Sequence, residues 1–297
     1  MNQAINLSLA ALLTLGAVGA ANAAPVTVSG NYIQMGVNNG GALIDPSTFI
    51  GIKYDPTSSG NFSSPIDYLT PGTPYAFYSI GVNGAIDTAE GGIDNNPFGT
   101  TTFDGSGLVG NPFTITNNGY YQGLSFKQVL FFDNTSQSIH ASVVFTNLSG
   151  AAINNVAYGV GIDPDQDIGA GGDFTTQNTI NGQADHASVT AFGAVSGYSI
   201  TLASTSGWID TVASIDKAWG TDPYSLSSMY KNDGNGDFTI NLGYKLGDFA
   251  VGEQKSIGYD YTMSAMMVPE PEVFAMMLLG LAVLGVKGRK SRSDTFC

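Results

Sequence analysis

Apolar and polar residues alternate along much of this chain with the two-residue period that turns one face of a β-strand towards a core. One run carries four apolar residues on the same face: Ile139, Ala141, Val143 and Phe145. The preceding run, 124–132, keeps the same period, with Gln128 at one position where an apolar residue is expected. A turn-rich segment at 133–137 separates the two runs, so the sequence predicts a β-hairpin here.

Strand patterns of this kind recur through the rest of the chain, whereas helical periodicity is almost absent. The other predicted strands lie at 26–37, 48–54, 75–82, 156–160, 187–195, 198–203, 237–246 and 255–263. Clusters of Gly, Asn, Ser and Pro separate them, as in proteins built from many short strands joined by turns. We therefore expect an all-β body folded as an antiparallel β-sandwich, with a closed β-barrel as the alternative.

The N-terminal end departs from this alternation, because an apolar run extends from Leu7 to Gly19. It precedes Ala21-Asn22-Ala23, whose two small residues have the spacing of a signal-peptidase site. We expect residues 1–23 to form the helix of a secretory signal peptide that signal peptidase removes. The remaining body, 24–267, would then lie outside the cytoplasm.

The C-terminal end has three consecutive parts. Val268-Pro269-Glu270-Pro271 comes first, and its two prolines fit neither a helix interior nor a central strand. An apolar run at 273–286 follows, which predicts a hydrophobic helix of 14 residues. A permanent transmembrane helix needs ~20 residues, so this segment would be a short membrane anchor. Basic residues, which stay on the cytoplasmic side, complete the tail: Lys287, Arg289, Lys290 and Arg292.

This order of parts, over residues 268–297, resembles the PEP-CTERM sorting signal of Gram-negative bacteria. The resemblance implies that the inner membrane holds the protein transiently, until an exosortase-type transpeptidase cleaves near the Pro-Glu-Pro step. It therefore implies export across the inner membrane and a final location on the cell surface or outside the cell.

The charge of the chain limits its partners. The formal net charge is −14, and arginine occurs only at Arg289 and Arg292 in the tail. Nucleic acid is therefore not expected as a partner, because binding a polyanion requires basic residues that displace its counterions. The only cysteine is Cys297, so the body has neither a disulfide nor thiol chemistry.

Acidic residues gather where the predicted strand at 156–160 ends. Ca²⁺ takes six to eight oxygen ligands, and closely spaced carboxylates in a loop provide them. The pattern is not an EF-hand, because Ile168 and Phe174 stand where that loop needs Gly and Glu. A solvated turn is the alternative, and a second Asp-x-Asn-x-Asp run at 233–237 also reads as a plain hairpin turn. The predicted calcium ligands are Asp163, Asp165, Asp167 and Asp173.

Catalytic motifs are not evident. The sequence contains no Gly-x-Ser-x-Gly motif and only two histidines, His140 and His186. Four aromatic residues that could stack on sugars or belong to the core are Trp208, Trp219, Tyr224 and Tyr230. We expect an exported, non-enzymatic surface or extracellular-matrix protein with a structural or adhesive role and with exopolysaccharide as a candidate partner. The alternative is a secreted protein that binds or cleaves carbohydrate.

Overall fold

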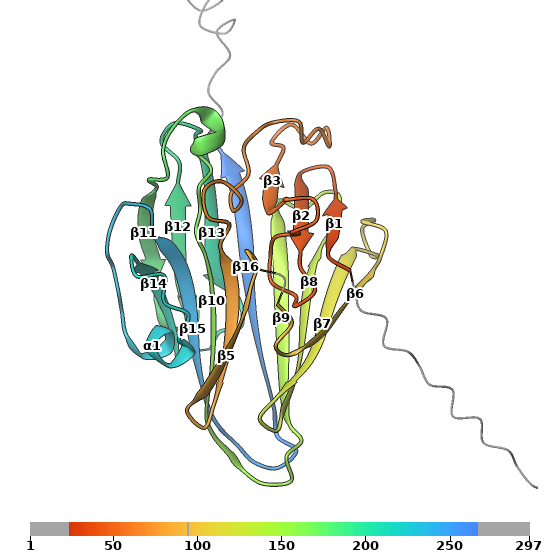
Figure 1. The fold of residues 1–297 in the computed structure, drawn as a ribbon, viewed down its shortest axis with the longest axis vertical. Coiled ribbons are helices and arrows are strands. Elements are labelled where there is room, and N and C mark those ends of the chain that lie inside the picture. Colours follow the sequence, from red (N-terminus) through yellow and green to blue (C-terminus); the bar gives the residue numbers. More distant parts are fainter. Residues whose placement is uncertain (1–23, 94, 209, 267–297) are drawn as a thin grey trace, which may run out of the picture.

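The computed structural model describes residues 24–93, 95–208 and 210–266, which form three antiparallel sheets (Figure 1). The smallest sheet contains β1 (Val26–Ser29), β2 (Ile33–Val37) and β3 (Ile52–Tyr54). The second has the order β14-β15-β10-β4-β5, with β14 (Thr211–Asp216), β15 (Thr239–Phe249), β10 (Ile153–Ile162), β4 (Ala76–Val82) and β5 (Ala85–Glu90).

The largest sheet has the order β11-β12-β13-β16-β9-β8-β7-β6. Its strands are β11 (Gln177–Gly182), β12 (Ser188–Phe192), β13 (Tyr198–Ser204), β16 (Gln254–Ala265), β9 (Ser138–Asn147), β8 (Leu124–Phe132), β7 (Phe113–Tyr121) and β6 (Gly99–Asp104). The described helices are α1 (Pro223–Ser228) and two 3₁₀ turns, η1 (Ile168–Ala170) and η2 (Ala184–His186).

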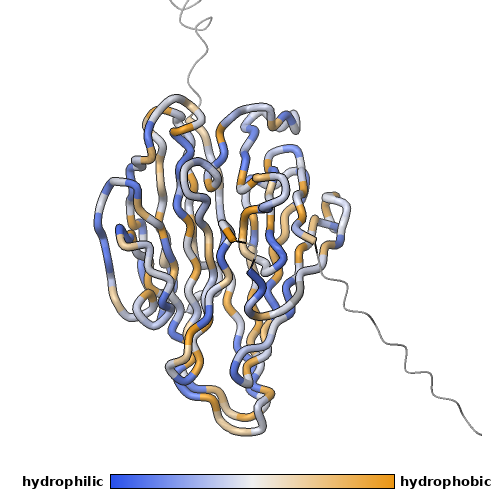
Figure 2. Tube along the Cα trace, viewed as in Figure 1, coloured by the Kyte–Doolittle hydropathy of each residue, from blue (hydrophilic) through white to orange (hydrophobic). Residues whose placement is uncertain are grey.

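The five- and eight-stranded sheets pack face to face, and the smallest sheet adds its apolar side chains to the same core. Tyr158 of β10 lies at the centre, where its hydroxyl and that of Tyr259 on β16 are 3.0 Å apart. The hydropathy colouring alternates along the strands, as this packing requires (Figure 2). All three sheets of the described residues are open, so the predicted sandwich is confirmed and the closed alternative is not.

The predicted hairpin is confirmed, because β8 and β9 pair in register from Leu124↔Asn147 to Phe131↔His140. Gln128 faces inward, as its phase predicts, and is 3% exposed. Its amide nitrogen donates to the carbonyl oxygen of Gly41 at 3.2 Å, which satisfies a polar group inside the sandwich. The structure divides the predicted strand 26–37 into β1 and β2, since Gly30 and the following residues form a turn.

Helix α1 lies on the outer face of the five-stranded sheet. Asp222 begins it, because its carboxylate accepts from the backbone N–H groups of Tyr224 and Ser225, and Pro223 occupies the first turn. The sheet provides glycines beneath it. A Cβ atom on Gly243 would collide with the backbone of Leu226, so the close contact between helix and sheet requires glycine there.

The predicted signal helix, sorting tail and anchor at 273–286 lie outside the described residues. No helix in the described part of the chain is both long and apolar enough to cross a bilayer.

Candidate functional site

Asp163 and Asp165 lie just beyond the end of β10, in a segment whose backbone is fixed by neighbouring loops. The N–H of Asp163 donates to the carbonyl oxygen of Tyr75 at 3.1 Å, and that of Asp165 to Tyr68 at 2.7 Å. Both side chains are only 2% exposed. The fold therefore holds two carboxylates, two positions apart, at one end of the five-stranded sheet.

Asp237 reaches the same place from a distant part of the sequence. It ends the 233–237 run, just before β15, the strand that pairs with β10. Two backbone hydrogen bonds of 3.1 Å join Gly236 to Thr176, and the carboxamide of Asn235 accepts from the N–H of Asn178. This loop is therefore anchored to β11 and the segment before it, which fixes where Asp237 lies.

The three carboxylates form one cluster. Each of Asp163, Asp165 and Asp237 offers an oxygen, and these oxygens all lie within 4.8 Å of one another. Among the described residues, no donor reaches either oxygen of Asp163 or Oδ1 of Asp165. A buried carboxylate without a donor or counter-charge is costly, so the cluster needs a proton or a cation.

The pKa values reflect this lack of compensation. Burial raises the pKa of Asp163 to about 8, and the nearby charge of Asp237 adds to the shift. Burial likewise raises the pKa of Asp165 to about 9, with further repulsion from Asp163 and Asp237. At neutral pH these two groups are therefore protonated unless a cation takes the place of the protons.

The cluster opens into a pocket of about 150 Å³. A single water takes about 30 Å³ in the liquid, so the pocket has room for several waters or for an ion with part of its hydration shell. The buried carboxylates form its floor, whereas Asp237, Phe174 and two loop residues are exposed at its rim. Its lining residues are Gly72, Thr73, Asp163, Asp165, Phe174, Trp219 and Asp237.

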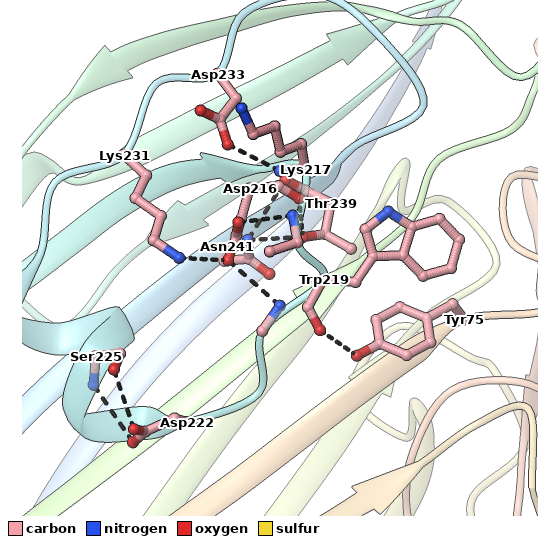
Figure 3. A network of polar contacts seen from close by, with 12 residues as sticks. Tyr75, Asp216, Lys217, Trp219, Asp222, Ser225, Lys231, Asp233, Thr239 and Asn241 are labelled. Atoms are coloured by element: carbon pink, nitrogen blue, oxygen red, sulfur yellow. Dashed lines mark hydrogen bonds and ion pairs between the residues drawn. The ribbon is translucent and has the colours of Figure 1, made fainter.

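Trp219 lines the same pocket as the three carboxylates, and Figure 3 shows how Tyr75 holds it. Its indole N–H donates to the backbone carbonyl oxygen of Asp237 at 3.3 Å, and its own carbonyl accepts from the Tyr75 hydroxyl at 3.0 Å. The Trp219 and Tyr75 rings pack with centroids 5.0 Å apart. Trp219 also adopts a left-handed backbone conformation with φ of +54°, which is uncommon for a bulky residue.

Asp216 stabilises the turn in which Trp219 adopts this backbone conformation. Its carboxylate accepts from the N–H groups of Ala218 and Gly220, and Lys231 donates to the same group at 2.8 Å (Figure 3). Burial alone would raise the pKa of Asp216, but these hydrogen bonds and the charge of Lys231 hold it below its usual value. Asp216 is thus fully compensated, in contrast to Asp163 and Asp165.

The other two predicted calcium ligands make different contacts. The carboxylate of Asp167 accepts from the N–H groups of Val195 and Ser196, at 3.0 and 2.7 Å, and fixes the turn before β13. Asp173 is exposed and accepts from the N–H of Thr175. The structure thus brings together Asp163 and Asp165 from the predicted set, and adds Asp237 from the run at 233–237.

The four aromatic residues singled out in the sequence separate in space. Only Trp219 lines the pocket. Trp208 packs against the core, and the ring of Tyr224 lies over Gly81 under α1. Tyr230 is 59% exposed. Phe174, which was noted only as an exception to the EF-hand pattern, is the second aromatic residue of the pocket. The signal-cleavage residues and all sorting-tail residues lie outside the described part of the chain.

Comparison with known proteins gives no family model and no curated protein that matches this chain. Solved structures with a similar arrangement include a bacterial glucoamylase complexed with acarbose, at 13% identity and a TM-score of 0.48 over 86% of this chain. This chain spans only 34% of that glucoamylase.

Two further similar structures are also named as carbohydrate-processing enzymes. A GH36 alpha-galactosidase from Geobacillus stearothermophilus has 8% identity and a TM-score of 0.43, covering 81% of this chain and 40% of its own. A galactose mutarotase related enzyme from Lactobacillus acidophilus has 9% identity and a TM-score of 0.38, covering 82% and 98%. Similarities this distant do not establish a function, and the expected lack of enzymatic activity stays a prediction.

Proposed function

We propose that this chain is an exported surface or extracellular-matrix protein whose sandwich holds a calcium ion in the three-aspartate pocket. The cluster of Asp163, Asp165 and Asp237 is the observation that carries the calcium part of the proposal. Three of the four oxygens of Asp163 and Asp165 are buried without a described donor, and a divalent cation would compensate them. The acidic composition of the chain also fits a cation as ligand.

Calcium suits this site better than the common alternatives. All three ligands are carboxylate oxygens, which hard cations prefer, whereas zinc favours imidazole and thiolate. Two oxygens bound to one Ca²⁺ at ~2.3–2.6 Å are at most ~5 Å apart, which accommodates the separations within the cluster. Ca²⁺ also tolerates irregular coordination, so waters or ligand hydroxyls in the pocket could complete a shell that three aspartates leave unfilled.

Calcium titration of the purified body tests this proposal. Free calcium at 100 times its dissociation constant should stabilise the folded state by about 2.7 kcal/mol. For a domain of this size the melting temperature should then rise by about 5–10 °C and fall back with chelator. The indole of Trp219 is bonded to Asp237, so tryptophan fluorescence should change over the same titration. Equal melting temperatures with calcium and with chelator would reject the calcium site.

Export and sorting form the second part of the proposal. The support is the sequence alone: the signal at 1–23 and the tail at 268–297. Mass spectrometry of the protein from cells with and without an exosortase-type enzyme tests this part. We expect a mature form that lacks residues 1–23 and ends near Pro269-Glu270-Pro271, released or surface-bound only when the enzyme is present. Full-length protein in the cytoplasm of both strains would contradict it.

A further inference from the structure

The pocket combines a polar floor with aromatic rings at its rim, a pairing that a cation site alone does not require. Trp219 and Phe174 line the same pocket as Asp163, Asp165 and Asp237. Phe174 is 40% exposed, and its ring covers Gly72, where a Cβ atom would lie only 2.6 Å from it. Two large rings therefore remain at an open site instead of joining the core.

Trp219 is also held rigidly at the pocket by its contacts. Its indole N–H is bonded to Asp237, whereas its carbonyl group and its ring both contact Tyr75. The turn held by Asp216 keeps it in a left-handed backbone conformation, which is strained for a bulky residue. Such strain is concentrated at ligand sites, where a ring held rigidly loses little conformational freedom on binding.

We propose that the pocket binds a neutral glycan, with two adjacent hydroxyls of one sugar ring completing the calcium shell and the apolar face of the sugar against Trp219. The inference rests on the proposed calcium site. Hydroxyl oxygens are suitable ligands for the positions that three carboxylates leave open on Ca²⁺. The volume of about 150 Å³ admits the edge of one sugar, so the remainder of the glycan lies outside the pocket.

The negative charge of the site favours a neutral glycan over an acidic one. Three carboxylates and one Ca²⁺ leave the site negative, and the whole chain carries a net charge of −14. None of the described residues that line the pocket is a lysine, and the nearby Lys231 is bonded to Asp216. A glycan with carboxylate or sulfate groups would therefore be repelled, whereas uncharged hydroxyls would not.

The test uses three immobilised neutral polysaccharides, a mannan, a galactan and a glucan, each intact and after periodate oxidation, which cleaves adjacent diols. We expect retention of the protein on at least one intact polysaccharide in calcium. Chelator should abolish the retention, and oxidation of the polysaccharide should abolish it too. Calcium binding is measured separately by calorimetry, so a failed calcium site and a failed glycan site give different results.

Variants separate the two roles. Trp219→Ala should bind calcium but lose about tenfold in glycan affinity, because it removes the apolar contact area of the indole ring. Asp165→Asn should lose both calcium binding and glycan binding. Trp208→Phe removes the other tryptophan, which packs against the core, and should keep both while leaving Trp219 as the sole fluorescence reporter.

Three results would overturn the inference while the calcium site stands. They are calcium binding with no retention on any of the polysaccharides, retention that persists in chelator or on oxidised polysaccharide, and unchanged affinity in Trp219→Ala. If Trp219→Ala fails to fold, Phe174→Ala provides the same comparison with the other aromatic residue that lines the pocket. That variant should bind the glycan more weakly and leave calcium binding intact.

Discussion

At the scale of single residues, aspartates of similar appearance in the sequence have different roles because their donors differ. Asp167 and Asp216 are almost completely buried, yet each accepts hydrogen bonds from two backbone N–H groups. Asp163 and Asp165 are equally buried, and no described donor reaches three of their four oxygens. The first two aspartates stabilise turns, whereas the second two need a ligand.

Asp165→Asn should remove most of the calcium-dependent rise in melting temperature, because it deletes a buried charged ligand. Without calcium, the variant should be at least as stable as the wild-type protein at pH 7. The pKa of Asp165 is about 9, so folding at that pH requires its protonation, which asparagine avoids. Thermal unfolding with calcium and with chelator measures both effects. Asp173→Asn is the matched control and should keep the full calcium response; a loss there would implicate the exposed loop instead.

The metal-free protein should lose stability as pH rises. Asp163 and Asp165 have pKa values of about 8 and 9 in the folded state, against 3.8 for an ordinary Asp. Between about pH 4 and pH 9 the folded state therefore binds more protons than the unfolded state, and the free energy of unfolding falls with pH. Urea unfolding in chelator at pH 5, 7 and 9 measures this slope.

In the double variant Asp163→Asn/Asp165→Asn, the free energy of unfolding should depend much less on pH. In the wild-type protein, saturating calcium should raise the free energy of unfolding most strongly at high pH. Calcium replaces the protons, so its affinity should rise over the same range. A metal-free stability that does not fall between pH 5 and 9 would contradict the raised pKa values.

The sequence predicts Asp163 and Asp165 as ligands because they directly follow a strand and lie two positions apart, the spacing of residues on the same face of a strand. It assigns Asp167 and Asp173 to the same set on spacing alone. β10, however, ends at Ile162, and the chain then turns through η1, so alternation no longer orients the later side chains. Asp237 lies 72 or more residues away in sequence from the other two, and only the pairing of β10 with β15 brings it near.

At the scale of secondary-structure elements, local patterns predict individual strands better than their partners. The hairpin of β8 and β9 follows from period and turn residues. The next strand, β10, continues the same kind of pattern but pairs with β15 and β4 in the other sheet. Helix α1 has only six residues, too few for a periodic signal, and its position depends on glycines in strands that are distant in sequence.

Gly243→Ala tests that dependence. The added methyl group would collide with the backbone of Leu226, so α1 must move away from β15. We expect a loss of about 1–3 kcal/mol in the free energy of unfolding, measured with urea. Gly258→Ala on β16 is the control, because its methyl group would meet the rotatable side-chain hydroxyl of Thr205 at 2.7 Å and the backbone of Ala141 only in ordinary contact at 3.4 Å. Equal costs for the two variants would mean that α1 does not require glycine beneath it.

At the scale of the whole molecule, a chain of polar groups connects the two larger sheets and the segment after β2 through the centre of an otherwise apolar core. Tyr158 from the five-stranded sheet and Tyr259 from the eight-stranded sheet share a hydrogen bond of 3.0 Å. Gln128, next to Tyr158, donates to Gly41 in the N-terminal segment that follows β2. Buried hydrogen bonds of this kind are directional, so they favour one relative position of the sheets where apolar contacts alone would permit several.

Tyr158→Phe should therefore cost about 1–3 kcal/mol in the free energy of unfolding, because it leaves the buried hydroxyl of Tyr259 without its partner. The double variant Tyr158→Phe/Tyr259→Phe should cost less than the sum of the single variants, since no unpaired hydroxyl then remains in that pair. Tyr120→Phe, at a residue that is 54% exposed, is the control and should change stability by less than about 0.5 kcal/mol. Strictly additive costs in the double variant would show that the two hydroxyls do not act together across the sandwich.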